Sequence, residues 1–163
     1  MTEFLLLLLA HVLVDFYWQP TSWVIDKREK KHQSRYLYFH VLLVIITSYL
    51  ALGHWQNPLP AIALGIAHGI IDIAKIHFDK KGTTAWFAAD QAAHVITIAL
   101  TALILTGTMQ PGFQTFVTWF YTPKTLATVS GALLSLSPIS FLVGILTRPW
   151  REELNKLAPG ADD

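Results

Sequence analysis

The chain has no cysteine and few charged residues, and each shortage excludes classes of protein. Without cysteine, disulfide frameworks, thiolate metal sites and cysteine nucleophiles are all excluded. Charged residues make up 14% of the 163 residues, whereas about 25% is usual in a soluble domain. Together with a hydrophobic fraction of 53%, this composition indicates a membrane protein. The chain also lacks a phosphate-binding glycine loop and any nucleic-acid-binding signature, so no nucleic-acid partner is expected.

The alternation of polar and apolar residues that is typical of strands is missing too, so we expect an all-α protein. Long apolar runs are present instead, and five of them have roughly the length of a membrane-spanning helix. These runs cover residues 4–18, 36–52, 61–78, 85–105 and 126–146. The first run lacks the basic flank and cleavage site of a signal peptide, so we expect it to be retained. The prediction is a polytopic helix bundle in one transmembrane domain, residues 1–157, with a disordered tail at 158–163.

Positive charge is confined to one side of a five-span arrangement. Eleven of the twelve Lys and Arg residues lie there, and Lys124 is the exception. Because basic connections stay in the cytoplasm, the pattern predicts an external N-terminus and a cytoplasmic C-terminus. We expect a multi-pass protein of the bacterial inner membrane.

Histidine and aspartate recur inside the apolar runs as pairs four residues apart. The pairs are His11/Asp15, His68/Asp72 and Asp90/His94, and His40 lies near the start of the second run. This spacing places both members of a pair on one helix face. The order is reversed in the run that crosses in the opposite direction, so each residue type is predicted to occupy its own depth. Ionisable groups inside a bilayer are costly and usually functional, so we predict a shared site.

The first and third runs also share the pattern Ala-His-x-aliphatic-aliphatic-Asp. It begins at Ala10 and again at Ala67. Both copies lie in runs predicted to cross in the same direction, so we interpret the halves as parallel repeats about an axis along the membrane normal.

Imidazole and carboxylate groups together suit divalent metals, with zinc the first choice and iron or manganese as alternatives. The expected ligands are His11, His40, His68, Asp72 and His94. Expected catalytic residues are Asp15, Asp90 and Lys75, and expected substrate-binding residues are Gln19 and Gln91. Asp15 or Asp90 is an alternative ligand. The centre could be dinuclear, or mononuclear with carboxylates that orient the histidine rings.

This chemistry favours a membrane-embedded, metal-dependent hydrolase that acts on a lipid or lipid-linked substrate at the cytoplasmic leaflet. Two alternatives stay open. One is a component that conducts protons or metal ions. The other is a non-catalytic membrane subunit whose polar layer only joins the helices. Membrane lipid is the expected partner, and self-association stays open.

Taken in order, the motifs resemble a domain-of-unknown-function family of small bacterial inner-membrane proteins. The matching pieces are His11-x3-Asp15-x3-Gln19, His40, His68-x3-Asp72-x2-Lys75 and Asp90-Gln91-x2-His94. The resemblance covers about residues 4–105 and implies the topology and the site, but no reaction. A weaker resemblance links the clustered His and Asp to membrane-bound metal-dependent hydrolases. The His-Arg and Thr-His-Ser pieces of that group are missing here, so hydrolysis by this route is an analogy.

Overall fold

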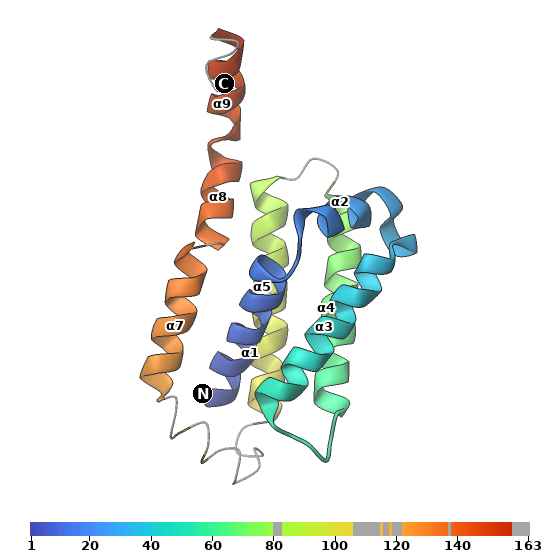
Figure 1. Ribbon diagram of the computed structural model, residues 1–163, viewed down its shortest axis with the longest axis vertical. Helices are drawn as coiled ribbons and strands as arrows, with labels where there is room; N and C mark the ends of the chain where they lie inside the picture. Colours follow the sequence, from blue (N-terminus) through green and yellow to red (C-terminus); the bar gives the residue numbers. More distant parts are fainter. Residues whose placement is uncertain (80–82, 106–114, 116–117, 119–121, 137, 158–163) are drawn as a thin grey trace.

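The computed structural model of the protein describes residues 1–79, 83–105, 115, 118, 122–136 and 138–157 (Figure 1). All regular structure in this part of the chain is helical. In order, the elements are α1 (Thr2–Val12), the π-helical turn η1 (Leu13–Tyr17), α2 (Thr21–Lys30), the 3₁₀ turn η2 (Lys31–Gln33), α3 (Arg35–Leu52), α4 (Leu59–Phe78), α5 (Thr84–Ile104), α7 (Pro123–Leu136), α8 (Pro138–Leu146) and α9 (Arg148–Leu157). The tail predicted at 158–163 lies outside the described residues.

Four helical segments are long and apolar enough to cross a membrane: α3, α4, α5, and α7 together with α8. The first helix becomes a fifth span if it is counted with α2, from which it is separated by a bend of 83°. The predicted all-α bundle of membrane-spanning helices is confirmed. The fifth apolar run is divided between α7 and α8 near Pro138, where we expect a kink because proline cannot donate a backbone hydrogen bond.

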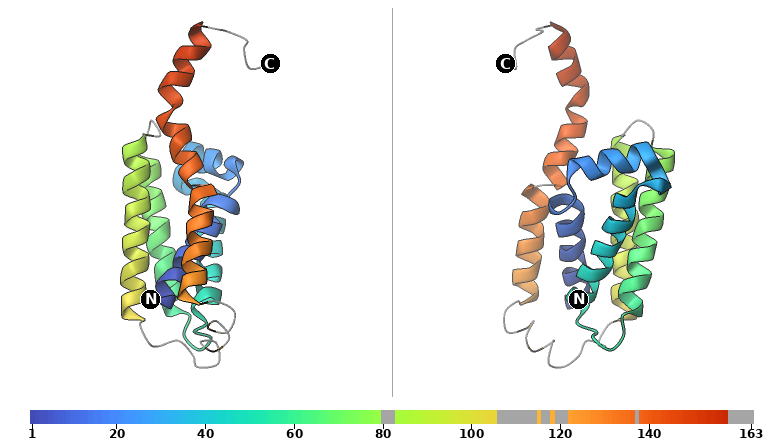
Figure 2. Two further views of the ribbon diagram at one scale, coloured as in Figure 1. Left: turned by 90° about the vertical axis from the view of Figure 1, so that its left-hand side faces the viewer. Right: turned by 45° about the vertical axis from the view of Figure 1, so that its right-hand side comes forward.

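The helices lie side by side, and α1 and α4 run in the same direction (Figure 1). At the end of the bundle where α1 and α4 finish, α2 turns across the other helices, and α9 extends beyond the same end (Figure 2). The basic residues of α2 and α9 therefore gather at one end, and the N-terminus lies at the other. The distribution of Lys and Arg in the sequence predicts this separation of the basic residues from the N-terminus. Which end faces the cytoplasm stays a prediction, as does the internal repeat.

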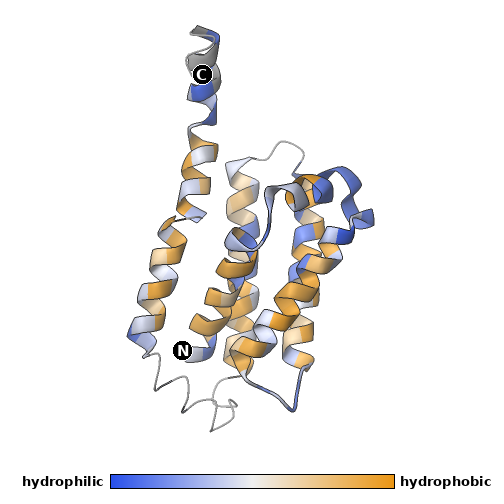
Figure 3. Cartoon of the chain, in the orientation of Figure 1, coloured by the Kyte–Doolittle hydropathy of each residue, from blue (hydrophilic) through white to orange (hydrophobic). Residues whose placement is uncertain are grey.

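The outer surface of the bundle is apolar, and hydrophilic residues concentrate on α2 and α9 (Figure 3). Large apolar side chains such as Leu42, Ile66, Ile70 and Leu103 are exposed along the spans, whereas polar side chains are buried between the helices. A soluble domain buries its apolar side chains and exposes its charges. The opposite distribution here is the one expected of helices surrounded by lipid.

The segment between α2 and α3 is held by Asp26. Its two carboxylate oxygens accept hydrogen bonds from Lys30 and, at 2.6 Å, from the hydroxyl of Ser34, the residue that precedes α3. These hydrogen bonds, first from Lys30 and then from Ser34, lower the pKa of Asp26 from its ordinary value. The turn fixes where α2 lies, and α2 covers one end of the bundle.

The packing of α3 against α4 depends on two glycines of α4. A Cβ atom added to Gly65 would lie 2.2 Å from Cγ1 of Ile45, and one added to Gly69 would lie 2.8 Å from Cγ2 of Val41. Small residues four positions apart allow membrane helices to approach closely. This close approach brings the polar side chains of α3 and α4 within reach of each other.

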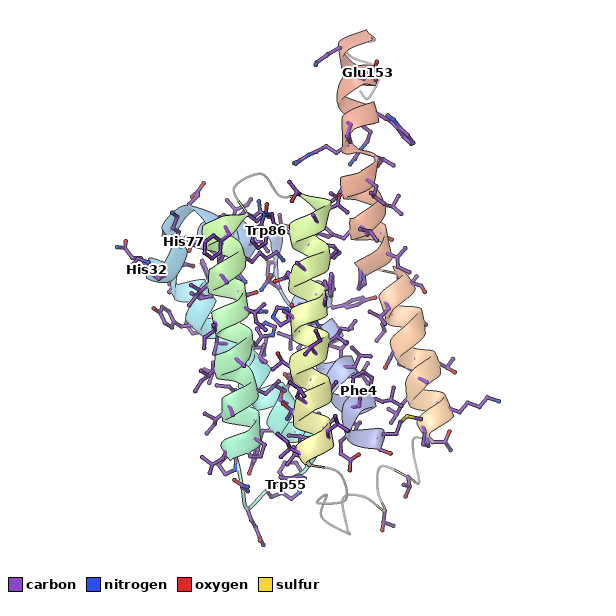
Figure 4. All side chains as sticks on the ribbon, turned by 180° about the vertical axis from the view of Figure 1, so that it is seen from behind. Phe4, His32, Trp55, His77, Trp86 and Glu153 are labelled. Atoms are coloured by element: carbon purple, nitrogen blue, oxygen red, sulfur yellow. The ribbon has the colours of Figure 1, made fainter. Side chains whose placement is uncertain are left out.

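Apolar packing fills the bundle towards the N-terminus. A buried cluster there consists of Leu7, Leu52, Leu64, Ile98 and Leu105, with Phe4 packed against it. Figure 4 shows Phe4 near the same end as Trp55, with Trp86 at the opposite end. Tryptophans at both ends of a bundle are typical of the two membrane interfaces.

We expect Gly65→Leu to destabilise the bundle, because even the Cβ atom overlaps Ile45 and α3 must move away from α4. Overpacking of this kind typically costs about 1–3 kcal/mol. The measurement is the unfolding temperature in detergent. Gly131→Leu in α7 is the matched control, because a Cβ atom there meets nothing within 4 Å. An equal fall in both variants would show that the α3–α4 contact is not special.

Candidate metal centre

Seven ionisable side chains meet inside the bundle, at the depth where α1 passes into η1. They are His11, Asp15, His40, His68, Asp72, Asp90 and His94. Six are buried, and the side chain of Asp15 is 12% exposed. The structure thus brings together all the histidines and aspartates that the spacing singled out. By contrast, His32 and His77 lie at the outside of the fold (Figure 4).

Asp15 lies in the π-helical turn η1. The amide of Trp18 donates to the carbonyl of Leu13 at 2.9 Å, a bond that spans five residues instead of four. Such wide turns recur at functional sites in α-helices. The turn ends the first span and leads directly into the sharp bend before α2. Asp15 is therefore placed where the membrane helix stops and the cavity described below begins.

Asp15, His40 and His68 converge on one point. Oδ1 of Asp15 lies 3.4 Å from Nε2 of each histidine, and the two Nε2 atoms are 2.9 Å apart. Ligand atoms bound about 2.1 Å from a tetrahedral zinc ion lie about 3.4 Å from one another. Two of the three separations therefore match a zinc site. The third is the length of a hydrogen bond between the rings and would have to open by about 0.5 Å to match.

Gln19 controls which nitrogen of His40 carries the proton. Its Nε2 lies 2.8 Å from Nδ1 of His40. In this orientation the amide donates to Nδ1, so the ring proton is on Nε2 and is donated to His68. A rotated amide would instead accept from Nδ1–H and leave the Nε2 lone pair for a metal. Partners of this kind fix the tautomer of metal-binding histidines.

His94 and His11 add a second set of potential ligands. Nδ1 of His94 donates to the backbone carbonyl of Asp90 at 2.8 Å, which leaves a lone pair on Nε2. That Nε2 atom and Nδ1 of His11 are buried without a hydrogen-bond partner. The His94 ring lies 5.0 Å from the His11 ring and 4.1 Å from the ring of His68, measured between centroids. Unpartnered buried nitrogens are costly unless something binds them, which supports a ligand role.

Two lysines neutralise the remaining carboxylates. Nζ of Lys27 donates to Oδ2 of Asp72 at 2.7 Å, and Nζ of Lys75 donates to Oδ2 of Asp90 at 2.6 Å. Lys75 was singled out from the sequence. Lys27 was missed, because it reads as one of several basic residues in a surface connection. The signal that could have found it is the count of charges: three aspartates in the spans need more compensation than a single lysine provides.

Gln91 links two parts of the polar layer. Its amide nitrogen donates to Oδ2 of Asp90 at 2.9 Å, and its amide oxygen lies 3.4 Å from Nε2 of His11. Gln19 and Gln91 therefore both contact histidines of the site. Their predicted role in substrate binding stays a prediction, but both also line the adjoining cavity.

A cavity of about 720 Å³ adjoins the polar layer. Asp15, Asp72, Lys75 and Gln91 line it where it meets the ionisable cluster. Most of the other lining residues come from η1, α2, α5, α8 and α9, and they include three phenylalanines and three arginines. A volume of this size is typical of a small-molecule binding site.

Comparison with known proteins identifies the family of this chain. A family model described as "Protein of unknown function (DUF3307)" matches residues 4–122. The chain belongs to this family. The DUF3307 region contains all seven members of the ionisable cluster and both lysines, but not the part of the cavity wall that α8 and α9 provide. No curated protein and no solved structure matches the chain significantly.

We expect Lys27→Met to destabilise the protein strongly, because it leaves the buried carboxylate of Asp72 without a counter-charge. Removing one partner of a buried ion pair costs about 3–5 kcal/mol. Adding Asp72→Asn to this variant should restore much of the loss, and thermal unfolding in detergent would measure both effects. The control is Lys30→Met in the same helix: its ion pair with Asp26 is exposed and should contribute little, and the Asp26–Ser34 hydrogen bond still holds the turn. If the Lys27→Met and Lys30→Met variants have equal unfolding temperatures, the buried Lys27–Asp72 pair does not support the fold.

Proposed function

We propose that this protein is a membrane-embedded, metal-dependent hydrolase that acts on a lipid or lipid-linked substrate at the cytoplasmic leaflet. One observation carries the proposal. Three potential ligand atoms, with two of their three separations matching a zinc site, lie beside a cavity of about 720 Å³. Zinc is the metal that we favour, and iron and manganese suit the same nitrogen and oxygen donors.

Asp15, His40 and His68 would hold the metal. Two histidines and one carboxylate are a common ligand set of catalytic zinc sites, and they leave a fourth position for water. Asp15 lines the cavity, so a metal held by these residues would lie next to the space for a substrate. This assignment exchanges the roles that the sequence suggested for Asp15 and Asp72. Spacing is the reason: Asp15 is 3.4 Å from both histidine nitrogens, whereas Asp72 already accepts a hydrogen bond from Lys27.

Asp72 is the proposed proton acceptor. Its Oδ2 atom lies 3.6 Å from Nε2 of His40, and the residue lines the cavity. A bound metal would lower the pKa of a coordinated water and polarise the scissile group. Asp72 would take one proton from the attacking water while the oxygen of that water bonds to the carbonyl carbon or phosphorus of the substrate. The bond to the leaving oxygen then breaks, and Lys75 supplies a proton to that oxygen.

An ion-conducting function has less support. It needs a polar path through the other half of the bundle. Within the described residues, that half is filled by the apolar cluster around Leu7 and Leu64. A smaller cavity between this cluster and the histidines is lined in part by Thr47, Ser48 and Thr97, and its volume is about 10 Å³. This is barely enough for one water molecule, so the geometry favours hydrolysis over conduction.

We expect the purified protein to bind about one zinc ion per chain, because the carboxylate of Asp15 already has the spacing of a zinc ligand from both histidine nitrogens. Asp15→Asn keeps the shape of the side chain but removes its charge, and it should weaken zinc binding at least about tenfold. Elemental analysis and titration in detergent would measure both. His77→Ala is the control, since this exposed histidine lies on the same helix as His68. Metal contents that are equal and low in all three proteins would remove the metal from the proposal.

We expect Asp72→Asn to retain zinc and to lose activity. Loss of a general base lowers kcat by about 10²–10⁴-fold. The assay follows the release of water-soluble and lipid products from vesicles of defined composition, with and without a chelator. Asp72→Asn leaves the buried ammonium of Lys27 without its counter-charge, so the assay is repeated in Lys27→Met/Asp72→Asn, and the unfolding temperatures of both variants check that the fold is kept. Full activity in Asp72→Asn would assign the proton transfer to another group.

A further inference from the structure

Building on the proposed hydrolase function, we propose that the lipid substrate carries a phosphate in its head group and that Arg148 and Arg151 bind this phosphate at the α8–α9 wall of the cavity. The proposal combines three observations on the cavity: its balance of charges, the placement of its arginines and its aromatic wall.

Cations outnumber carboxylates along the cavity. Its five cationic residues are Lys27, Arg28, Lys75, Arg148 and Arg151, and its three carboxylates are Asp15, Asp72 and Asp79. The carboxylates come from η1, α4 and the residue that follows α4, whereas two of the cations come from α9. Even when Asp90, which pairs with Lys75, is counted, five cations face four carboxylates, so the α9 side of the cavity favours an anionic ligand.

The two arginines are placed to act together. They are three residues apart in α9, so their side chains lie on neighbouring positions of one helix face. Nη2 of Arg151 donates to the backbone carbonyl of Gly144 at 2.6 Å, which turns the side chain back towards α8. A guanidinium group has five donors, so Arg151 keeps others for a ligand while this contact holds it. Arginine is well suited to phosphate because its planar fork can form two parallel hydrogen bonds.

Aromatic residues in the same cavity wall as the arginines indicate a lipid rather than a free phosphate compound. Phe87 lies 6.4 Å from Phe16 and 5.1 Å from Phe141, measured between ring centroids. All three phenylalanines line the cavity, together with Ile25 and Ile145. A water-soluble phosphate would gain nothing from this apolar wall. An acyl or isoprenoid chain would be shielded from water there, while its phosphate meets the cationic end.

The position of the arginines also fits a membrane lipid. They begin α9, which extends beyond the bundle at the end covered by α2 (Figure 1). Tyr17 and Trp18, at the end of the first span, are exposed there, as is typical of side chains at head-group level. A lipid whose chains lie along the spans would bring its phosphate to this depth.

The test measures lipid binding to chelator-treated, metal-free protein. Native mass spectrometry in detergent detects the bound lipid. The probes are phosphatidic acid, diacylglycerol with the same acyl chains, and inorganic phosphate. We expect Arg148→Gln/Arg151→Gln to weaken phosphatidic acid binding at least about tenfold and to leave diacylglycerol binding unchanged. The charge-matched control is Lys124→Gln/Lys156→Gln, whose residues do not line the cavity, and it should change binding less than about twofold.

Phe141→Ala tells lipid from free phosphate, because it should weaken phosphatidic acid binding without affecting inorganic phosphate. If inorganic phosphate binds as well as phosphatidic acid, the ligand is a soluble phosphate and the lipid assignment is wrong. Equal losses in the arginine pair and in the lysine control would overturn the site. Should the double variant unfold, Arg148→Gln alone carries the test, since it spares the Arg151–Gly144 contact. All of these binding measurements use metal-free protein, so they can be interpreted even if the hydrolase proposal fails.

Discussion

The cost of placing charge in a bilayer governs this structure. An unpaired carboxylate in the hydrocarbon region is unfavourable by several kcal/mol, so each must meet a counter-charge or a hydrogen-bond donor inside the protein. Here four helical segments turn their polar faces inward, and their aspartates meet lysines and histidines instead of lipid. The same requirement explains why one end of the bundle is polar and crowded, whereas the other is filled by aliphatic side chains. The candidate metal centre follows from this inward pairing.

Much of the fold and of the site could be predicted from the sequence. The apolar runs gave the spans to within a few residues, because length and composition alone decide which helices can cross a membrane. The four-residue spacing of histidine and aspartate, with its order reversed in the run around Asp90 and His94, predicted that these side chains would meet. Lys27 escaped prediction, because its role depends on the sharp bend that returns α2 over the bundle. Periodicity within one helix carries no information about such a return.

Other features depend on contacts between segments far apart in the chain. Gly65 and Gly69 have the spacing of a close-packing motif, but the sequence does not say that α3 is the helix that approaches them. The cavity wall is a similar case, since Phe141 and Arg151 come from the end of the chain and face residues near its beginning. Their association is a matter of helix packing. The candidate ligands of the site can thus be predicted from the sequence, whereas the cavity beside the site cannot.

The contact between Lys27 and Asp72 implies an order of events during biosynthesis. Lys27 leaves the ribosome 45 residues before its partner, so it has no buried acceptor while the first two spans are being inserted. Until α4 is integrated, the ammonium group has to stay in the hydrated interface, and α2 cannot close over the bundle. The docking of α2 and the assembly of the candidate metal centre beneath it therefore occur together, as a late step of membrane integration.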